Sequence, residues 1–133
     1  MKHILILLVA VICFSCSSDD DGNGNQRFHP PTWIQGTWIQ AGSQDLNGVK
    51  FTTDDFCVLE AGLESCYKSI IEQSELDVYV EDEEITDTDY EFEINYYGEP
   101  GVERELEFHF RLKSDNEIVE IENGLETNTY TKQ

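Results

Sequence analysis

Basic residues are scarce in this sequence. The chain of 133 residues has 8 Lys and Arg against 28 Asp and Glu, which gives a formal net charge of −20. Proteins hold nucleic acid with basic side chains that neutralise phosphates, so the composition excludes nucleic acid as the expected partner. The same excess of acid disfavours adsorption to anionic lipid, so attachment to a bilayer would need a source other than the protein's own charge. The length fits one domain.

A long apolar run is also lacking. The single unbroken run extends from Ile4 to Phe14, "ILILLVAVICF", and is shorter than the roughly 20 residues that span a bilayer. It follows Lys2 and His3 and matches the apolar core of a signal peptide, which is about 7–15 residues long. A buried helix is the alternative, but the N-terminal position and the charged start favour a signal peptide over residues 1–15.

Catalytic and nucleotide-binding motifs are missing as well. The sequence contains no Gly-x-Ser-x-Gly, no His-Glu-x-x-His, no phosphate loop and no dinucleotide fingerprint. Pairs of carboxylates are unavoidable among 28 acidic residues and therefore carry no information. We accordingly predict no enzyme, no catalytic residue and no cofactor.

Cys16 follows a small residue, Ser15, directly after the apolar run. This arrangement resembles the lipobox of bacterial lipoproteins. The resemblance implies cleavage before Cys16 and acylation of Cys16, palmitate included, which would anchor the chain in the bilayer. Cys13 stands where the family usually has Leu. Cys13 is itself the less favoured candidate for acylation because the bulky Val11 and Ile12 precede it.

An acidic stretch comes next, with Ser17, Ser18, Asp19, Asp20 and Asp21. It resembles the export tag that some Gram-negative bacteria place after the lipidated cysteine. That tag implies the outer membrane, with the domain facing the cell exterior. The alternative is a solvated linker on a lipoprotein of the periplasmic face. Either way, residues 16–31 are predicted to form a flexible tether, because Gly, Asn, Ser and Asp bury little surface.

Apolar and polar residues alternate with a period of two along much of the remaining chain. This pattern is typical of half-buried antiparallel strands, and turn sequences such as "KSDNE" and "ENG" separate them. We expect strands over residues 37–41, 49–53, 56–59, 67–73, 76–80, 90–96, 106–112, 118–122 and 128–132. So many short strands predict an all-β barrel or sandwich.

Three segments resemble bacterial lipocalin-like domains: "WIQGTWIQ" at Trp33–Gln40, "VKFTTDDF" at Val49–Phe56 and the terminal "IVEIENGLETNTYTKQ". The resemblance implies a small antiparallel up-and-down barrel over residues 32–133, with a β-sandwich as the alternative. Gly36 would let the chain bend into the first strand. The candidate interior residues are Trp38, Phe51, Phe92, Phe108 and Phe110.

The implied function is a noncatalytic binding module with a small apolar ligand inside the barrel. The alternative is an interaction domain whose barrel is filled by these large side chains and which meets a partner protein or a glycan.

Cys57 and Cys66 remain after processing and flank "VLEAGLES". A hairpin around Ala61 and Gly62 would place them opposite each other. Because the secretory route is oxidising, we predict a disulfide between them. Two cysteines without nearby histidines fall short of a tetrahedral metal site, so no metal is expected.

The segment 80–89 is unusually acidic. Its carboxylates at 81–84 and 87–89 are calcium-type ligands, but the regular Asp-x-Asp-x-Asp-Gly loop is missing. A solvated acidic rim is therefore the favoured interpretation. His29 is placed in the tether. His109, in "EFHFR", is expected on the solvent side, opposite Phe108 and Phe110.

Overall fold

The computed structural model describes residues 27–73, 78–97 and 102–133, and strands dominate it. The elements are β1 (Gly36–Gln40), β2 (Gly48–Phe51), β3 (Phe56–Glu60), β4 (Leu63–Cys66), α1 (Tyr67–Gln73), β5 (Val78–Ile85), β6 (Asp89–Tyr97), β7 (Glu103–Ser114), β8 (Glu117–Glu122) and β9 (Leu125–Lys132). Within these residues, no helix has the length and apolarity needed to cross a bilayer. The predicted signal peptide, Cys16 and the segment Ser17–Asp21 lie outside the described residues.

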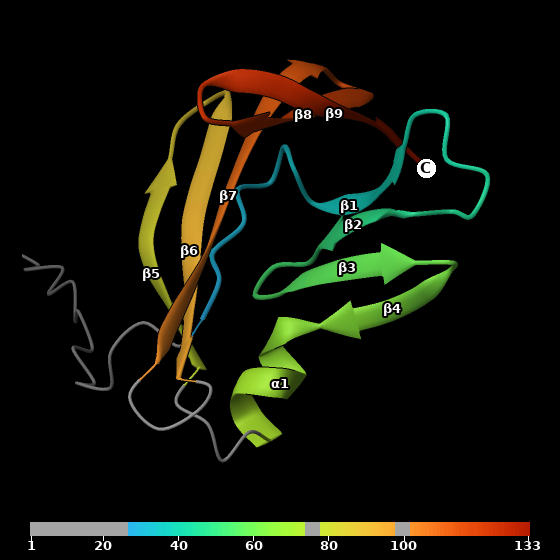
Figure 1. Ribbon diagram of the computed structural model, residues 1–133. Coiled ribbons are helices and arrows are strands. Elements are labelled where there is room, and N and C mark those ends of the chain that lie inside the picture. The colour runs from blue at the N-terminus through green and yellow to red at the C-terminus, as the bar shows by residue number, and fades with distance from the viewer. Residues whose placement is uncertain (1–26, 74–77, 98–101) are drawn as a thin grey trace, which may run out of the picture.

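The nine strands form one antiparallel sheet in the order β4-β3-β2-β1-β9-β8-β7-β6-β5. Every hydrogen-bonded neighbour is also a neighbour in sequence, except that β1 pairs with β9. The sheet curls into a half-barrel with β4 and β5 at its two ends (Figure 1). The prediction of an all-β, antiparallel, up-and-down fold is confirmed, in a shape consistent with a lipocalin-like barrel. The described strands lie in one sheet, whereas a sandwich has two.

Tight hairpins join several strands. Glu60 pairs with Leu63 across Ala61–Gly62, and Glu122 pairs with Leu125 across Asn123–Gly124. All four turn residues have positive φ, between 50° and 77°, which is the conformation of a two-residue type I′ turn. This turn matches the twist of the flanking strands and sets their register.

Aromatic rings fill the concave side of the half-barrel. Of the predicted interior residues, Trp38, Phe51, Phe92 and Phe110 are buried, and Phe108 is partly buried against the same cluster. Phe56 of β3 and Phe108 of β7 face each other across the curl, with ring centroids 4.9 Å apart. These contacts join opposite sides of the sheet, so the interior is packed with rings over much of its length.

Two glycines are needed where β1 meets its neighbouring strands. Gly36 has φ +132°, and a Cβ there would meet the Lys132 side chain at 2.9 Å. A Cβ on Gly48 would lie 2.1 Å from the backbone oxygen of Trp38 on the neighbouring strand. Gly36 thus provides the predicted bend into β1, and Gly48 lets β2 approach Trp38 closely.

The segment that leads into β1 belongs to the core. Phe28 and Ile34 are fully buried, and Phe28 packs against Phe92 with ring centroids 5.4 Å apart. His29 lies beside Phe28 and bonds to Glu83 of β5 through its backbone N–H at 2.6 Å and its ring at 2.8 Å. The packed part of the chain therefore starts before residue 32, the predicted boundary, and includes residues that the sequence placed in the tether.

The prediction of a strand at Tyr67–Gln73 is wrong, because this segment forms helix α1. Tyr67 and Ile71 lie one turn apart and pack against the aromatic core, where the Tyr67 ring stacks on Phe56 at 5.6 Å. The Asp55 carboxylate accepts a hydrogen bond of 2.8 Å from the Lys68 backbone N–H. This cap comes from a distant turn and stabilises a helix that the local pattern does not favour.

Candidate functional site at the edge of strand β7

Backbone pairing between β7 and β8 covers only the second half of β7. Their paired residues begin with Phe110 and Glu120 and continue toward the β7–β8 turn. Residues 103–109 of β7 have partners on β6 alone. We call residues 103–108, on the side away from β6, the β7 edge. Along this edge, no other described strand forms backbone hydrogen bonds with β7.

The direction of these backbone groups follows from one hydrogen bond. The N–H of Leu112 donates to the Thr88 oxygen at 2.8 Å, on the β6 side. The register of β6 and β7 is continuous from Arg111 to Glu103. Because backbone groups alternate along a strand, those of Leu106 and Phe108 face β6, and those of Glu105 and Glu107 face the open side.

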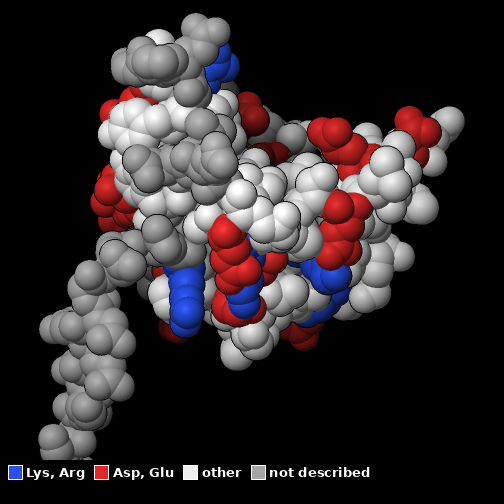
Figure 2. Space-filling model, turned by 90° about the horizontal axis from the view of Figure 1, so that it is seen from below, with Lys and Arg blue, Asp and Glu red and all other residues white. Residues whose placement is uncertain are grey.

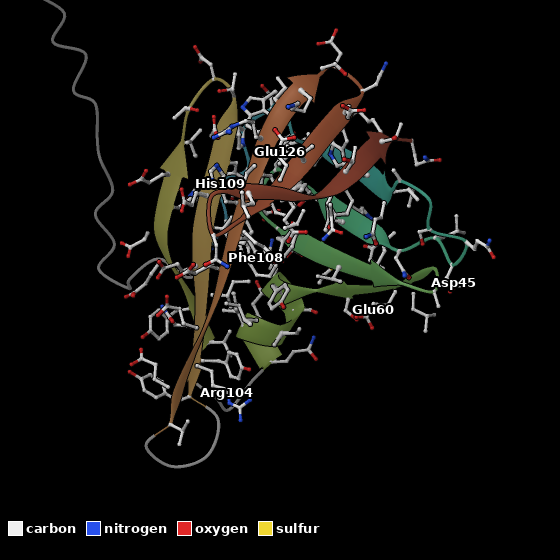
Figure 3. The ribbon with its side chains drawn as sticks, turned by 45° about the horizontal axis from the view of Figure 1, so that its top comes forward. Asp45, Glu60, Arg104, Phe108, His109 and Glu126 are labelled. Atoms are coloured by element: carbon white, nitrogen blue, oxygen red, sulfur yellow. A yellow bond between two sulfur atoms is a disulfide. The ribbon has the colours of Figure 1, made fainter. Side chains whose placement is uncertain are left out.

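A hollow of about 440 Å³ lies on the outer face next to the β7 edge. In Figure 3 the β8–β9 hairpin passes across β7 beside His109. The lining residues come from β6, β7 and that hairpin, and they are Glu91, Glu107, His109, Arg111, Ile121, Glu122, Asn123 and Gly124. Three carboxylates thus surround the hollow.

His109 is held on the outer face, as predicted. Its Nε2 lies 2.8 Å from Asp89, and its Nδ1 lies 3.9 Å from Glu91. Arg111 donates to the same Asp89 oxygen at 2.8 Å. Burial alone would raise the pKa of Asp89, but hydrogen bonds from His109, Thr88 and Arg111 outweigh it and lower that pKa. The group fixes the wall of the hollow.

The charged side chains around His109 hold one another in place. The Nε2 atom of His109 is within hydrogen-bonding distance of Asp89, and its Nδ1 atom lies 3.9 Å from Glu91, which also lines the hollow. The residues that line the hollow include no serine, threonine, cysteine or lysine to act as a nucleophile. The arrangement is suited to holding charged groups in place.

Carboxylates gather on the outer face beside the β7 edge. Glu93, Glu105 and Glu107 each bring an oxygen within 4.8 Å of the others, and Glu81 and Glu107 both pair with Glu93 across the strands. A hydrogen bond with Glu107, some loss of solvent and the neighbouring negative charges raise the pKa of Glu105. Burial and nearby carboxylates also raise the pKa of Glu93. Like charges directly opposite each other destabilise a sheet, so a cationic neighbour would relieve this face.

A second hollow, of about 250 Å³, lies on the inner side of the same strand. Its apolar walls include Val49, Val58 and Phe108. Its polar side is a hydrogen-bonded chain, in which Gln40 donates to Asn128, and both Asn128 and Tyr130 donate to Glu120, each at 2.8 Å. The inner hollow is therefore amphipathic.

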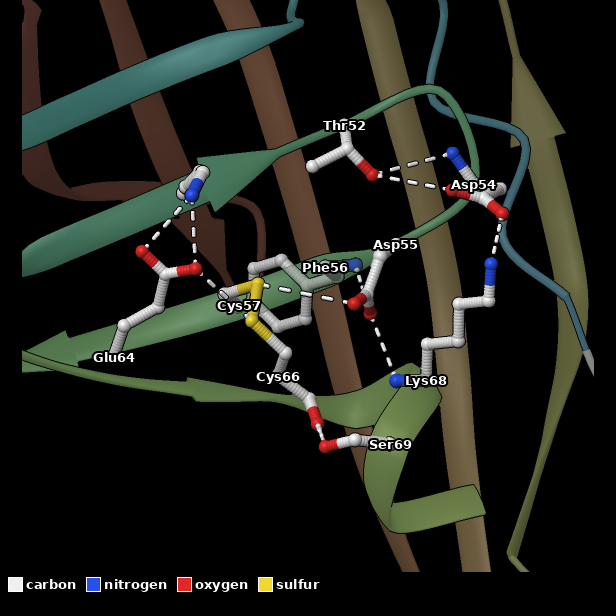
Figure 4. The surroundings of a disulfide bond; sticks show 10 residues. Thr52, Asp54, Asp55, Phe56, Cys57, Glu64, Cys66, Lys68 and Ser69 are labelled. Atoms are coloured by element: carbon white, nitrogen blue, oxygen red, sulfur yellow. Dashed lines mark hydrogen bonds and ion pairs between the residues drawn. A yellow bond between two sulfur atoms is a disulfide. The ribbon is translucent and has the colours of Figure 1, made fainter. Parts of the chain in front are cut away.

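The predicted disulfide between Cys57 and Cys66 is present and joins β3 to β4 at a directly paired position (Figure 4). Asp55 lies next to it and accepts 2.8 Å hydrogen bonds from the backbone N–H groups of Phe56 and Lys68. Because the two sulfurs are bonded to each other, they offer no free thiolate, and the group of Asp55, Cys57 and Cys66 serves to hold β3, β4 and the start of α1 together.

Sequence reasoning missed two inward carboxylates. Glu83 belongs to the stretch interpreted as a solvated rim, yet its side chain is only 13% exposed and accepts a 2.6 Å hydrogen bond from the Tyr90 hydroxyl. An irregularity in β5 between Glu81 and Glu84 turns it inward. Glu120 faces inward because it pairs with Phe110. Glu120 lies two residues after the buried Ile118 and therefore on the same face, which was the available signal. The local sequence contained no such signal for Glu83.

Comparison of the chain with protein-family models, curated proteins and solved structures finds no match. The interpretation of the site therefore depends on its own geometry.

Proposed function

We propose that this protein is a lipid-anchored, noncatalytic interaction domain that meets a partner through the β7 edge and the two hollows beside it. The observation that carries the proposal is the aromatic filling of the half-barrel. Phe28, Phe92 and Phe110 are fully buried in the concave side, and the inner hollow lined by described residues of β1, β2, β3, β7, β8 and β9 measures about 250 Å³. Pockets for small ligands are about 300–1,000 Å³, so the packing favours an interaction domain over an internal apolar ligand.

The location of the larger hollow supports the same choice. The hollow of about 440 Å³ lies on the outer face and is lined by Glu91, Glu107 and Glu122. Carboxylates suit a polar or charged partner and do not suit an apolar ligand. Both hollows open beside a strand edge, where a partner can reach them.

The anchor in this proposal is Cys16. Acylation there would hold the domain at the outer membrane, and the acidic stretch Ser17–Asp21 would direct it to the cell exterior. Acidic side chains predominate over basic ones on the face seen in Figure 2, which keeps the domain away from anionic lipid and leaves the acyl chains as the attachment.

Three experiments test the proposal. Labelled palmitate is expected to enter the wild-type protein but not the Cys16→Ser variant, and protease added to intact cells is expected to digest the domain. Native mass spectrometry of the full-length protein from its own host separates the two binding modes, and we expect no retained small molecule. A stoichiometric small molecule that is lost in a Phe108→Trp variant would overturn the interaction domain in favour of a ligand carrier.

A further inference from the structure

We propose that the β7 edge binds an extended segment of a partner protein as an added strand, and that this segment alternates basic with apolar side chains. The inference rests on the proposed function and names the class of partner. It starts from the backbone of Glu105 and Glu107, whose N–H and C=O groups face the open side of β7. Strand addition satisfies such groups and needs no other change in the fold.

The two hollows lie on opposite faces of the sheet at this edge. Successive side chains of a strand point to opposite faces, so an added strand would direct every second side chain inward and the others outward. Inward residues would meet Leu106, which is 36% exposed, and the inner hollow beside Phe108. Outward residues would meet Glu105, Glu107 and the outer hollow. The surface therefore fits an alternating segment.

Charge decides which segment fits. Glu93, Glu105 and Glu107 bring carboxylate oxygens within 4.8 Å of one another on the outer face, and cations beside them would remove a repulsion that the free protein carries. A second copy of this chain is a poor occupant, because each copy has a net charge of −20. The acidic stretch Ser17–Asp21 is unsuitable for the same reason. The occupant is therefore a basic segment from a different protein.

The other sheet edges are less suited to strand addition. β4 has only four residues. β5 is interrupted between Glu81 and Glu84, and Asp82 has φ +47° there. Irregularities of this kind protect an edge against added strands. The register of the β7 edge is uninterrupted, so it offers the regular template that an added strand requires.

The test uses the full-length protein in detergent micelles and a capped nine-residue peptide that alternates lysine with valine. We expect saturable binding that is at least tenfold tighter than binding of the same peptide with glutamate in place of lysine. Two further peptides are N-methylated at every lysine or at every valine. Because only alternate amides of an added strand face β7, one of them is expected to lose binding at least tenfold and the other to retain it. Equal affinity of both would overturn strand addition.

Variants place the binding at the β7 edge. Glu105→Lys/Glu107→Lys is expected to weaken binding of the lysine–valine peptide at least tenfold. The matched control is Asp45→Lys/Asp115→Lys, which changes the charge equally and is expected to bind within twofold of wild type. Asp45 lies away from this edge in the connection between β1 and β2 (Figure 3), and Asp115 lies in the turn between β7 and β8, beyond the paired part of β7. Circular dichroism checks that both variants fold. If either variant fails to fold, binding of the two N-methylated peptides to the wild-type protein still tests strand addition.

Failure of the inference and failure of the proposed function are distinguishable. No binding of the lysine–valine peptide, or equal weakening by both double variants, would overturn the basic strand and leave the interaction domain in place. A small molecule retained in the interior would overturn the interaction domain itself.

Discussion

Phe110 of β7 and Glu120 of β8 are paired, and at this pair the two strands part. Both side chains face the concave side, where Glu120 holds Asn128 and Tyr130 by hydrogen bonds of 2.8 Å. Toward Glu103, β6 is the one described strand that pairs with β7. The pair therefore marks the point where a closed part of the half-barrel gives way to an open strand edge.

Removing the disulfide is expected to destabilise the domain. Cys57 and Cys66 are separated by 9 positions, and a loop of that size corresponds to about 2–3 kcal/mol in the chain-entropy estimate. Urea unfolding of the full-length Cys57→Ala/Cys66→Ala variant, followed by tryptophan fluorescence, should show this loss. Reductant should destabilise the wild type by a similar amount and leave the variant unchanged. A variant with the wild-type midpoint would show that the bridge contributes nothing.

Asp55→Ala is expected to lower the free energy of unfolding by about 1–2 kcal/mol, because the N–H groups of Phe56 and Lys68 lose their shared acceptor. Asp55→Asn is the matched control and should lose less, since its amide oxygen can accept both hydrogen bonds. Chemical denaturation measures both variants. Equal losses would mean that the carboxylate's charge, and not its role as acceptor, holds the start of α1.

The same residue gives a pH dependence. Burial raises the pKa of Asp55 above its ordinary value of 3.8, against the lowering effect of the N–H groups of Lys68 and Phe56. The folded state therefore binds this proton more tightly than the unfolded state. The contribution of Asp55 to stability is most favourable below pH 3.8 and declines as pH rises through the raised pKa. The stability of wild type relative to Asp55→Asn should fall over that interval, and a rise would contradict the assignment.

The two type I′ turns provide a reciprocal pair of substitutions. Ala61 has φ 50° and Asn123 has φ 53°, a conformation that alanine adopts at a cost of about 1 kcal/mol and asparagine adopts more readily. Ala61→Asn should raise the thermal midpoint, and Asn123→Ala should lower it by a similar amount. Each variant is the control for the other. A change of the same sign in both would show that turn conformation is not the cause.

Local sequence pattern was enough to predict the sheet. Alternation placed Phe92, Phe108 and Phe110 on one face, and the hairpin between Cys57 and Cys66 brought the two sulfurs together as predicted. These features depend on neighbours along one strand or across one tight turn. A single sequence contains that information directly.

Structural features that depend on contacts between residues far apart in the chain could not be predicted from the local sequence pattern. Helix α1 depends on a cap from Asp55, 13 positions before Lys68, and Glu83 turns inward to meet His29 and Tyr90. The β7 edge is open because β8 ends its pairing at Glu120, although the alternation within β7 continues past that point. Pairing partners and bulges are set by the whole sheet, so the candidate site emerged only from the fold.

Amide hydrogen exchange on the full-length protein in micelles tests the central claim most directly. We predict that the amides of Glu105 and Glu107 exchange fast, at least about a hundredfold faster than those of Leu106 and Phe108, which face β6. Saturation with the lysine–valine peptide should slow the two glutamate amides and leave the other two unchanged. Equal and strong protection of all four amides in the free protein would mean that the β7 edge is already paired, and would contradict the account.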